Sequence, residues 1–93
     1  MISSWKDEEA KKVFLGIYSK RLPHEIQRNA RKKLIMIDSS VDINDLRIPP
    51  SNRLHKLTGD RKEQYSVSIN NQWRICFNWE NNNAFNLEIC DYH

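Results

Sequence analysis

Apolar and polar residues alternate through the C-terminal third of the chain, from Tyr65 to Trp79 and again from Ala84 onward. A period of two is typical of β-strands that pack one face on a core. Two asparagine-rich segments, 70–72 and 81–83, interrupt the alternation. Asparagine tolerates the left-handed backbone of tight turns. The pattern therefore predicts three consecutive antiparallel strands.

The alternation also predicts how these strands pair. If the odd-numbered residues of all three strands face the core, the numbers of two opposed residues must sum to an even number. The resulting pairs are Ile69 with Trp73, Trp79 with Phe85, and Arg74 with Cys90. Arg74 then lies beside the polar end of the chain, and we look for function there.

Helical spacing replaces the alternation in the N-terminal half. Asp7 is suited to cap a first helix, whose apolar face is Ala10, Val13, Phe14, Ile17 and Tyr18. A second helix is expected from about Pro23 to Asp38, with the buried stripe Ile26, Ala30, Leu34 and Ile37. Two antiparallel helices on one face of a small, mainly antiparallel sheet make an α+β fold of two layers.

Shorter segments complete this picture. Residues 2–5 can add an edge strand, and residues 42–46 a short helical turn. Residues 47–53 contain two prolines and predict a stiff extended loop. At 93 residues, the chain is expected to form one domain, residues 1–93, with one modest core.

Composition narrows the class of protein. Hydrophobic residues make up 39% and charged residues 29%, as in ordinary globular proteins. No apolar run approaches the roughly 20 residues that span a bilayer. The N-terminus lacks the basic and apolar regions of a signal peptide. We therefore expect a cytoplasmic protein with no membrane partner.

The net charge is only +3, but its distribution is uneven. Between Lys11 and Lys33 there are eight Lys or Arg residues and one acid, Glu25. A locally basic surface suits a polyanionic partner, although such runs are also common on solvated helix faces. The candidate nucleic-acid contacts are Lys20, Arg21, Arg28, Arg31, Lys32, Arg53, Lys56, Arg61 and Lys62.

The polar residues that are predicted to lie near Arg74 and the end of the chain are of the types that phosphodiester cleavage uses. RNA cleavage needs a base, an acid, cations that offset charge on the phosphorane, and a group that positions the bases. His55 and His93 suit proton transfer because the pKa of histidine lies near neutrality. Arg74 suits a bidentate phosphate clamp. Tyr92 can stack on a base and Asp91 can orient a neighbouring imidazole.

Plainer interpretations stay open for these residues. An exposed histidine often has no function, and Arg74 can instead pair across strands with Glu88. The histidines and carboxylates show no metal-ligand spacing, and the chain has no glycine-rich phosphate loop. We expect neither a metal nor a cofactor.

Three segments carry a resemblance to a known family. They are the run from Pro49 to Asp60, the strand from Tyr65 to Phe77 that contains Trp-Arg-Ile-Cys-Phe, and the terminal Asp-Tyr-His. Together they resemble the HigB family of bacterial toxins, within the RelE/ParE superfamily, over essentially the whole chain. The resemblance implies a RelE-like fold and a ribosome-dependent endoribonuclease that cleaves messenger RNA in the A site without a metal. It places the site on His55, Arg74, Asp91, Tyr92 and His93.

The resemblance also implies partners. These are the ribosome, messenger RNA and a helix-turn-helix antitoxin of the HigA type, with operator DNA bound only through the antitoxin complex. One position departs from the pattern, because some relatives carry a lysine where this chain has Thr58. Lys56 or Arg61 can substitute for it, or the enzyme is slow.

Two other functions compete with the nuclease. The first is a non-catalytic inhibitor that binds a partner protein, as the gyrase-poisoning ParE members of the superfamily do. The second is a plain RNA-binding module, which would show steep salt dependence and form no products.

Overall fold

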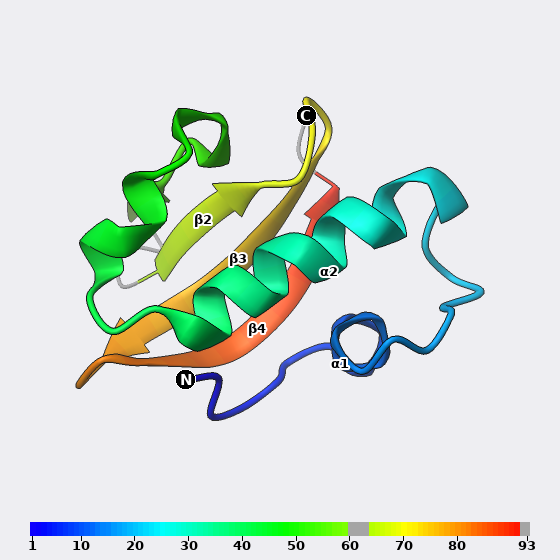
Figure 1. The fold of residues 1–93 in the computed structure, drawn as a ribbon, viewed down its shortest axis with the longest axis horizontal. Coiled ribbons are helices and arrows are strands. Elements are labelled where there is room, and N and C mark those ends of the chain that lie inside the picture. The colour runs from blue at the N-terminus through cyan, green and yellow to red at the C-terminus, as the bar shows by residue number, and fades with distance from the viewer. Residues whose placement is uncertain (60–63, 92–93) are drawn as a thin grey trace.

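The computed structural model describes residues 1–59 and 64–91, and it has a helical layer packed on a four-stranded sheet (Figure 1). The predicted contacts Arg61 and Lys62 and the predicted site residues Tyr92 and His93 lie outside the described residues. The helices are α1 (Glu8–Phe14) and α2 (His24–Ser39), followed by the 3-10 helices η1 (Ile43–Arg47) and η2 (Pro50–Asn52). The strands are β1 (His55–Lys56), β2 (Gln64–Ser68), β3 (Trp73–Glu80) and β4 (Asn83–Asp91). All neighbouring strands are antiparallel, in the order β1-β2-β3-β4, which confirms the α+β class.

The pairing of β2 with β3 follows the predicted register. Val67 lies opposite Ile75, and the amide of Ile69 donates to the carbonyl of Trp73 at 2.8 Å. The same register continues into β4 near the chain end, where Arg74 lies opposite Cys90. The position of Arg74 beside the last residues of the sheet is therefore confirmed.

The other end of the β3–β4 hairpin was predicted wrongly. The turn has two residues, Asn81 and Asn82, both with positive φ (52° and 64°), which is the backbone of a type I′ turn. Trp79 therefore pairs with Ala84 rather than Phe85. A β-bulge between Cys76 and Asn78 restores the predicted register, and Asn86 on the facing strand has φ 55°. As a result Ala84 is fully buried and Phe85 is not.

Helix α2 covers the sheet with the apolar stripe that its sequence predicts. Ile26, Ala30, Leu34 and Ile37 are each at most 2% exposed, and they pack against Val67, Ile75, Phe77 and Leu87 of the sheet. In Figure 1, α2 lies across the view over β3 and β4, whereas α1 is seen end-on, so the two helices cross. The sheet face on the helix side thus forms the core.

Helix α1 is shorter than its apolar spacing predicts. It ends at Phe14, and Gly16 (φ 81°) adopts the left-handed conformation. The amide of Gly16 donates to Val13 O at 3.0 Å, and that of Ile17 donates to Lys12 O at 2.8 Å, which makes a Schellman cap. Ile17 and Tyr18 are more than half exposed instead of buried. The prediction that they extend the helical face was wrong.

The connecting segments agree in part with the predictions. The N-terminal segment lies alongside β4 through two parallel bridges, from Ile2 to Ala84 and from Trp5 to Leu87. Helix η1 forms at the predicted turn, capped by Asp42. Residues 47–53 are not a simple extended loop, because Pro50–Asn52 close a 3-10 turn and Asn52 is fully buried. No helix in the described ranges is long and apolar enough to cross a membrane.

Candidate active site

The sheet face opposite the helices is polar, and we call it the polar face. It carries Ser66 and Ser68 from β2, Arg74 and Cys76 from β3, and Glu88 and Cys90 from β4, as the register requires. Ser66 is fully buried and Ser68 and Cys76 are nearly so. The strands thus hold a set of short polar side chains around one long cation, Arg74.

Arg74 is oriented by a hydrogen bond to the neighbouring strand. Its Nη1 donates to Ser66 Oγ at 2.8 Å. Ser66 in turn lies directly opposite His55 of β1, so the imidazole side chain belongs to the same face as the guanidinium. The register therefore brings together two of the predicted site residues, His55 and Arg74, with the Ser66 hydroxyl between them. The sequence did not predict a role for Ser66, because its alternation with Val67 indicates only that its side chain faces away from the core.

Asp91 is placed differently from Arg74. It lies opposite Trp73, whose side chain belongs to the helix side of the sheet, and its Oδ1 accepts a hydrogen bond from Gln72 Nε2 at 3.2 Å. By this register Asp91 belongs to the helix side of the sheet, so the structure does not bring it onto the face that carries His55 and Arg74. Glu88, the alternative partner considered for Arg74, lies opposite Cys76 and forms an ion pair with Lys6 at 3.2 Å.

Lys56 lies away from the polar face. It is opposite Tyr65, and its Nζ is 5.8 Å from the centroid of the Tyr65 ring, on the helix side of the sheet. This contact is a cation–π geometry. The structure therefore does not bring Lys56 together with His55 and Arg74, although sequence reasoning had offered it as a substitute for the lysine that Thr58 replaces.

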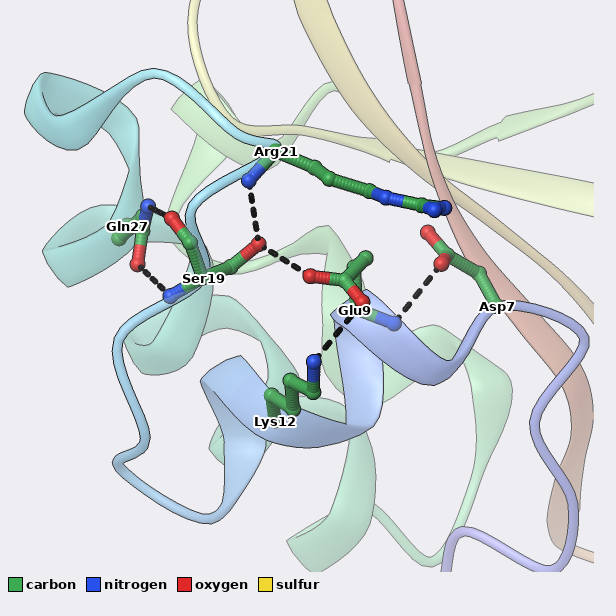
Figure 2. Close-up of polar contacts among 6 residues, drawn as sticks. All are labelled: Asp7, Glu9, Lys12, Ser19, Arg21 and Gln27. Atoms are coloured by element: carbon green, nitrogen blue, oxygen red, sulfur yellow. Dashed lines mark hydrogen bonds and ion pairs between the residues drawn. The ribbon is translucent and has the colours of Figure 1, made fainter.

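The loop between α1 and α2 presents two of the predicted basic contacts, Lys20 and Arg21, at the surface. Figure 2 shows how the loop is held, with Ser19 at its centre. Ser19 Oγ donates to Glu9 Oε1 at 2.6 Å, and the amide and carbonyl of Ser19 both bond to the Gln27 side chain, at 3.0 and 2.7 Å. Hydrogen bonds from Ser19 and Lys12 lower the pKa of the Glu9 carboxyl. The loop is thus fixed to both helices by buried or half-buried polar contacts.

The remaining predicted basic residues that the structure describes do not lie on the polar face. Arg28, Arg31 and Lys32 are exposed on α2, on the opposite side of the sheet from His55 and Arg74. Arg53 follows η2 and lies near Lys32, since both line the same cavity. A nucleic acid that contacted both these basic residues and Arg74 would have to wrap around the edge of the sheet at β2.

One buried cation was not predicted. Lys33 is 6% exposed, and its Nζ donates to Oδ1 of the fully buried Asn52 at 2.5 Å. Burial, and secondarily the charge of Lys32, lowers the pKa of Lys33. Asn52 also donates to the carbonyl of Leu46 at 3.1 Å, which ties η1, η2 and α2 together. Helical periodicity alone places residue 33 beside the apolar stripe, and nothing local indicates its distant partner.

Metal ligation finds no support in the described residues. Among residues 1–59 and 64–91, no group of three or more His, Cys, Asp or Glu side chains is arranged to hold a metal ion. The polar face presents the His55 imidazole, the Arg74 guanidinium and the Ser66 hydroxyl, beside the thiols of Cys76 and Cys90 and the carboxyl of Glu88.

Comparison with known proteins settles the family. Residues 3–93 match the model of the HigB-like toxin family, described as RelE-like toxins of the type II toxin–antitoxin system HigB. The chain belongs to this family. As the toxin of a toxin–antitoxin system, it has an antitoxin for a partner. The resemblance to the HigB family inferred from the sequence is confirmed.

Individual relatives of this HigB-like toxin are similar over most or all of its length. A protein of Proteus vulgaris named Endoribonuclease HigB is 31% identical over 93 residues, which is the whole of both chains. Toxin HigB-1 of Vibrio cholerae is 37% identical over 68 residues, covering 73% of this chain and 72% of its own. An uncharacterised protein of Haemophilus influenzae is 39% identical over 69 residues, covering 74% of this chain and 68% of its own.

Proposed function

We propose that this HigB-like toxin is an endoribonuclease that cleaves messenger RNA in the ribosomal A site and so stops translation and growth. The name of the Proteus vulgaris relative supports the nuclease activity. The observation that carries the proposal is the polar face, where His55 lies opposite Ser66 and Ser66 accepts a hydrogen bond from Arg74. A protein that only bound a partner would not need an imidazole and a guanidinium directed at one spot.

The proposed reaction is metal-independent transesterification by acid and base. One of His55 and His93 takes the proton of the RNA 2′-hydroxyl, and the other protonates the departing 5′-oxygen. Arg74 offsets the charge that develops on the phosphorane, and its bond to Ser66 holds the guanidinium in position before substrate arrives. Tyr92 positions the nucleotide and Asp91 supports the terminal histidine.

The proposed partners are the ribosome, messenger RNA and a helix-turn-helix antitoxin of the HigA type. Operator DNA would be bound only through the toxin–antitoxin complex. The exposed cations Lys20 and Arg21 of the α1–α2 loop and Arg28 and Arg31 of α2 are the proposed contacts with ribosomal RNA, since they lie on the side of the sheet away from Arg74. Substrate and ribosome would then occupy different surfaces of the toxin.

The proposal is tested by mapping the 5′ ends of messenger RNA in cells that briefly express the wild type or His93→Ala. The expected result is new cuts inside reading frames that require active translation and are lost in the variant. Intact transcripts together with arrested growth would refute the nuclease. A DNA-damage response in the same cells would then indicate a gyrase-directed inhibitor of the ParE kind.

A further inference from the structure

A second basic feature lies beside the polar face, at the free edge of β2. A cavity of about 380 Å³ opens between α2, η2 and the β2–β3 turn, and we call it the basic pocket. Its walls include Lys32, Lys33, Arg53, Asn29, Ser68 and Asn70. No aspartate or glutamate is among the described residues that line it. Its volume lies in the range of about 300–1,000 Å³ that small-ligand sites occupy.

Lys33 distinguishes this pocket from a group of surface cations, because its charge is nearly buried. Its side chain is nearly buried, and among residues 1–59 and 64–91 its ammonium has one hydrogen-bond acceptor, Asn52 Oδ1, and no carboxylate partner. A desolvated charge without a counterion destabilises the fold, and burial accordingly lowers the Lys33 pKa. An anion bound in the pocket would offset that cost. The pocket therefore favours an anionic ligand.

The two cations of the pocket are held in place. Asn52, which lies behind the pocket lining, is fixed by its bonds to the carbonyls of Leu46 and Ile48, so it holds the Lys33 ammonium in a defined position. Arg53 caps η2 with φ 47°, and its amide donates to Pro50 O at 3.0 Å. Two cations on separate elements thus face one cavity from fixed backbones, which is a favourable arrangement for a phosphate group.

The pocket is continuous with the polar face. Ser68 lines the pocket and lies directly opposite Arg74 in the sheet. Among the residues that the structure describes, strand β1 pairs with Tyr65 and Ser66 alone, so it does not cover the edge of β2 at Ser68. A single strand of RNA that crosses Arg74 can therefore reach the pocket without leaving the surface.

We propose that the basic pocket binds a backbone phosphate of the RNA strand next to the one cleaved, through Lys33 and Arg53. This inference rests on the proposed nuclease function, because it takes RNA as the substrate that lies over Arg74. The pocket would position the strand and contribute to RNA affinity, while the chemistry stays with the groups of the polar face.

The test measures binding of a short single-stranded RNA whose 2′-hydroxyls are all methylated, so that it cannot be cleaved. Lys33→Met removes the buried charge with little change of shape, and Arg53→Asn removes the exposed charge with a residue that tolerates positive φ. We expect each variant to weaken binding about tenfold and to reduce the salt slope of log K by about 0.7, the value for one phosphate contact in single strands. Lys11→Met, an exposed change on α1 outside the pocket, is the matched control and should bind as the wild type does.

A titration with inorganic phosphate provides a second readout. The amide resonances of Lys33, Asn52 and Arg53 should shift in the wild type and not in Arg53→Asn. Should Lys33→Met fail to fold, Arg53→Asn decides the matter. A folded Arg53→Asn variant that binds RNA as tightly as the wild type would overturn the proposal, as would the absence of phosphate shifts in the wild type. A loss of antitoxin binding with RNA binding unchanged would overturn it too. In either case, translation-dependent cuts by the wild type would leave the nuclease function intact.

Discussion

Replacing Asn52 with alanine should destabilise the toxin more than its small size suggests. The Asn52 side chain is fully buried, accepts a hydrogen bond from Lys33, and donates to the carbonyls of Leu46 and Ile48. Loss of the charge-assisted bond costs about 1.5–3 kcal/mol, and loss of the Leu46 bond about 1 kcal/mol. The Ile48 bond, at 3.4 Å, adds little. We expect the free energy of unfolding to fall by about 3 kcal/mol, a large share of the roughly 5–15 kcal/mol of a typical domain.

Urea unfolding followed by circular dichroism measures this loss. The midpoint should fall while the slope stays constant, and the melting temperature should drop by roughly 12–24 °C. Asn44→Ala is the control, since Asn44 is exposed on η1 and its side chain bonds only to Arg47 among the described residues, while its backbone amide keeps its bond to Asp42 in the variant. Its expected loss is below about 0.5 kcal/mol. A loss below about 1 kcal/mol for Asn52→Ala would refute the assigned role.

A double-mutant cycle isolates the Lys33 contact. Lys33→Met alone leaves Asn52 Oδ1 without its donor, so the two single changes should not add. We expect a coupling energy of about 1–2 kcal/mol between Lys33→Met and Asn52→Ala. Simple additivity would show that the bond contributes nothing to stability.

Three further predictions concern acid stability, the hairpin and the chain end. The lowered pKa of Glu9 means that the stability contributed by its carboxylate is present above pH 4.5 and is lost as the pH falls through its folded-state pKa. Glu9→Gln should therefore flatten the acid limb of an unfolding series, and an unchanged limb would contradict this role. Asn82→Ala should cost about 1 kcal/mol in urea unfolding because φ at this position is 64°, whereas Asn82→Gly should cost nothing; equal losses would contradict the turn geometry. A tag fused after His93 should reduce growth inhibition far more than an N-terminal tag, and equal effects in a plating assay would count against a terminal active site.

Where alternation and turn residues agreed, the sequence predicted the sheet correctly. The β2–β3 pairing and the place of Arg74 opposite Cys90 follow from the rule that odd residues face the core. The error in the β3–β4 hairpin has a specific cause. A single-residue bulge shifts the pairing by one, and Phe85 continues the apparent period better than the small Ala84 that is actually buried. Residue patterns carry little information about bulges.

The sequence contains a signal for the end of helix α1, but the apolar spacing beyond it favoured a longer helix. Gly16 is a typical helix terminator, yet Ile17 and Tyr18 happened to continue the helical spacing and favoured a longer helix. Lys33 could not have been predicted at all. Its burial depends on Asn52, 19 residues away, and no local pattern reports such a contact.

The candidate site was predictable in part for the same reasons. His55 and Arg74 were selected for their chemistry, and only the two-residue strand β1 brings them to one face. Ser66, which holds Arg74, carries no signal in the sequence because its role depends on a diagonal contact between strands.

The most direct test of the account is the single-turnover rate of messenger RNA cleavage in purified ribosomes with a defined A-site codon. Arg74→Gln should fold normally and cleave at least about 100-fold more slowly, since it removes the cation assigned to the phosphorane. Arg47→Gln, an exposed change on η1 outside the polar face, should cleave at the wild-type rate. A folded Arg74→Gln variant that cleaves as fast as the wild type would contradict the claim that the polar face is the active site.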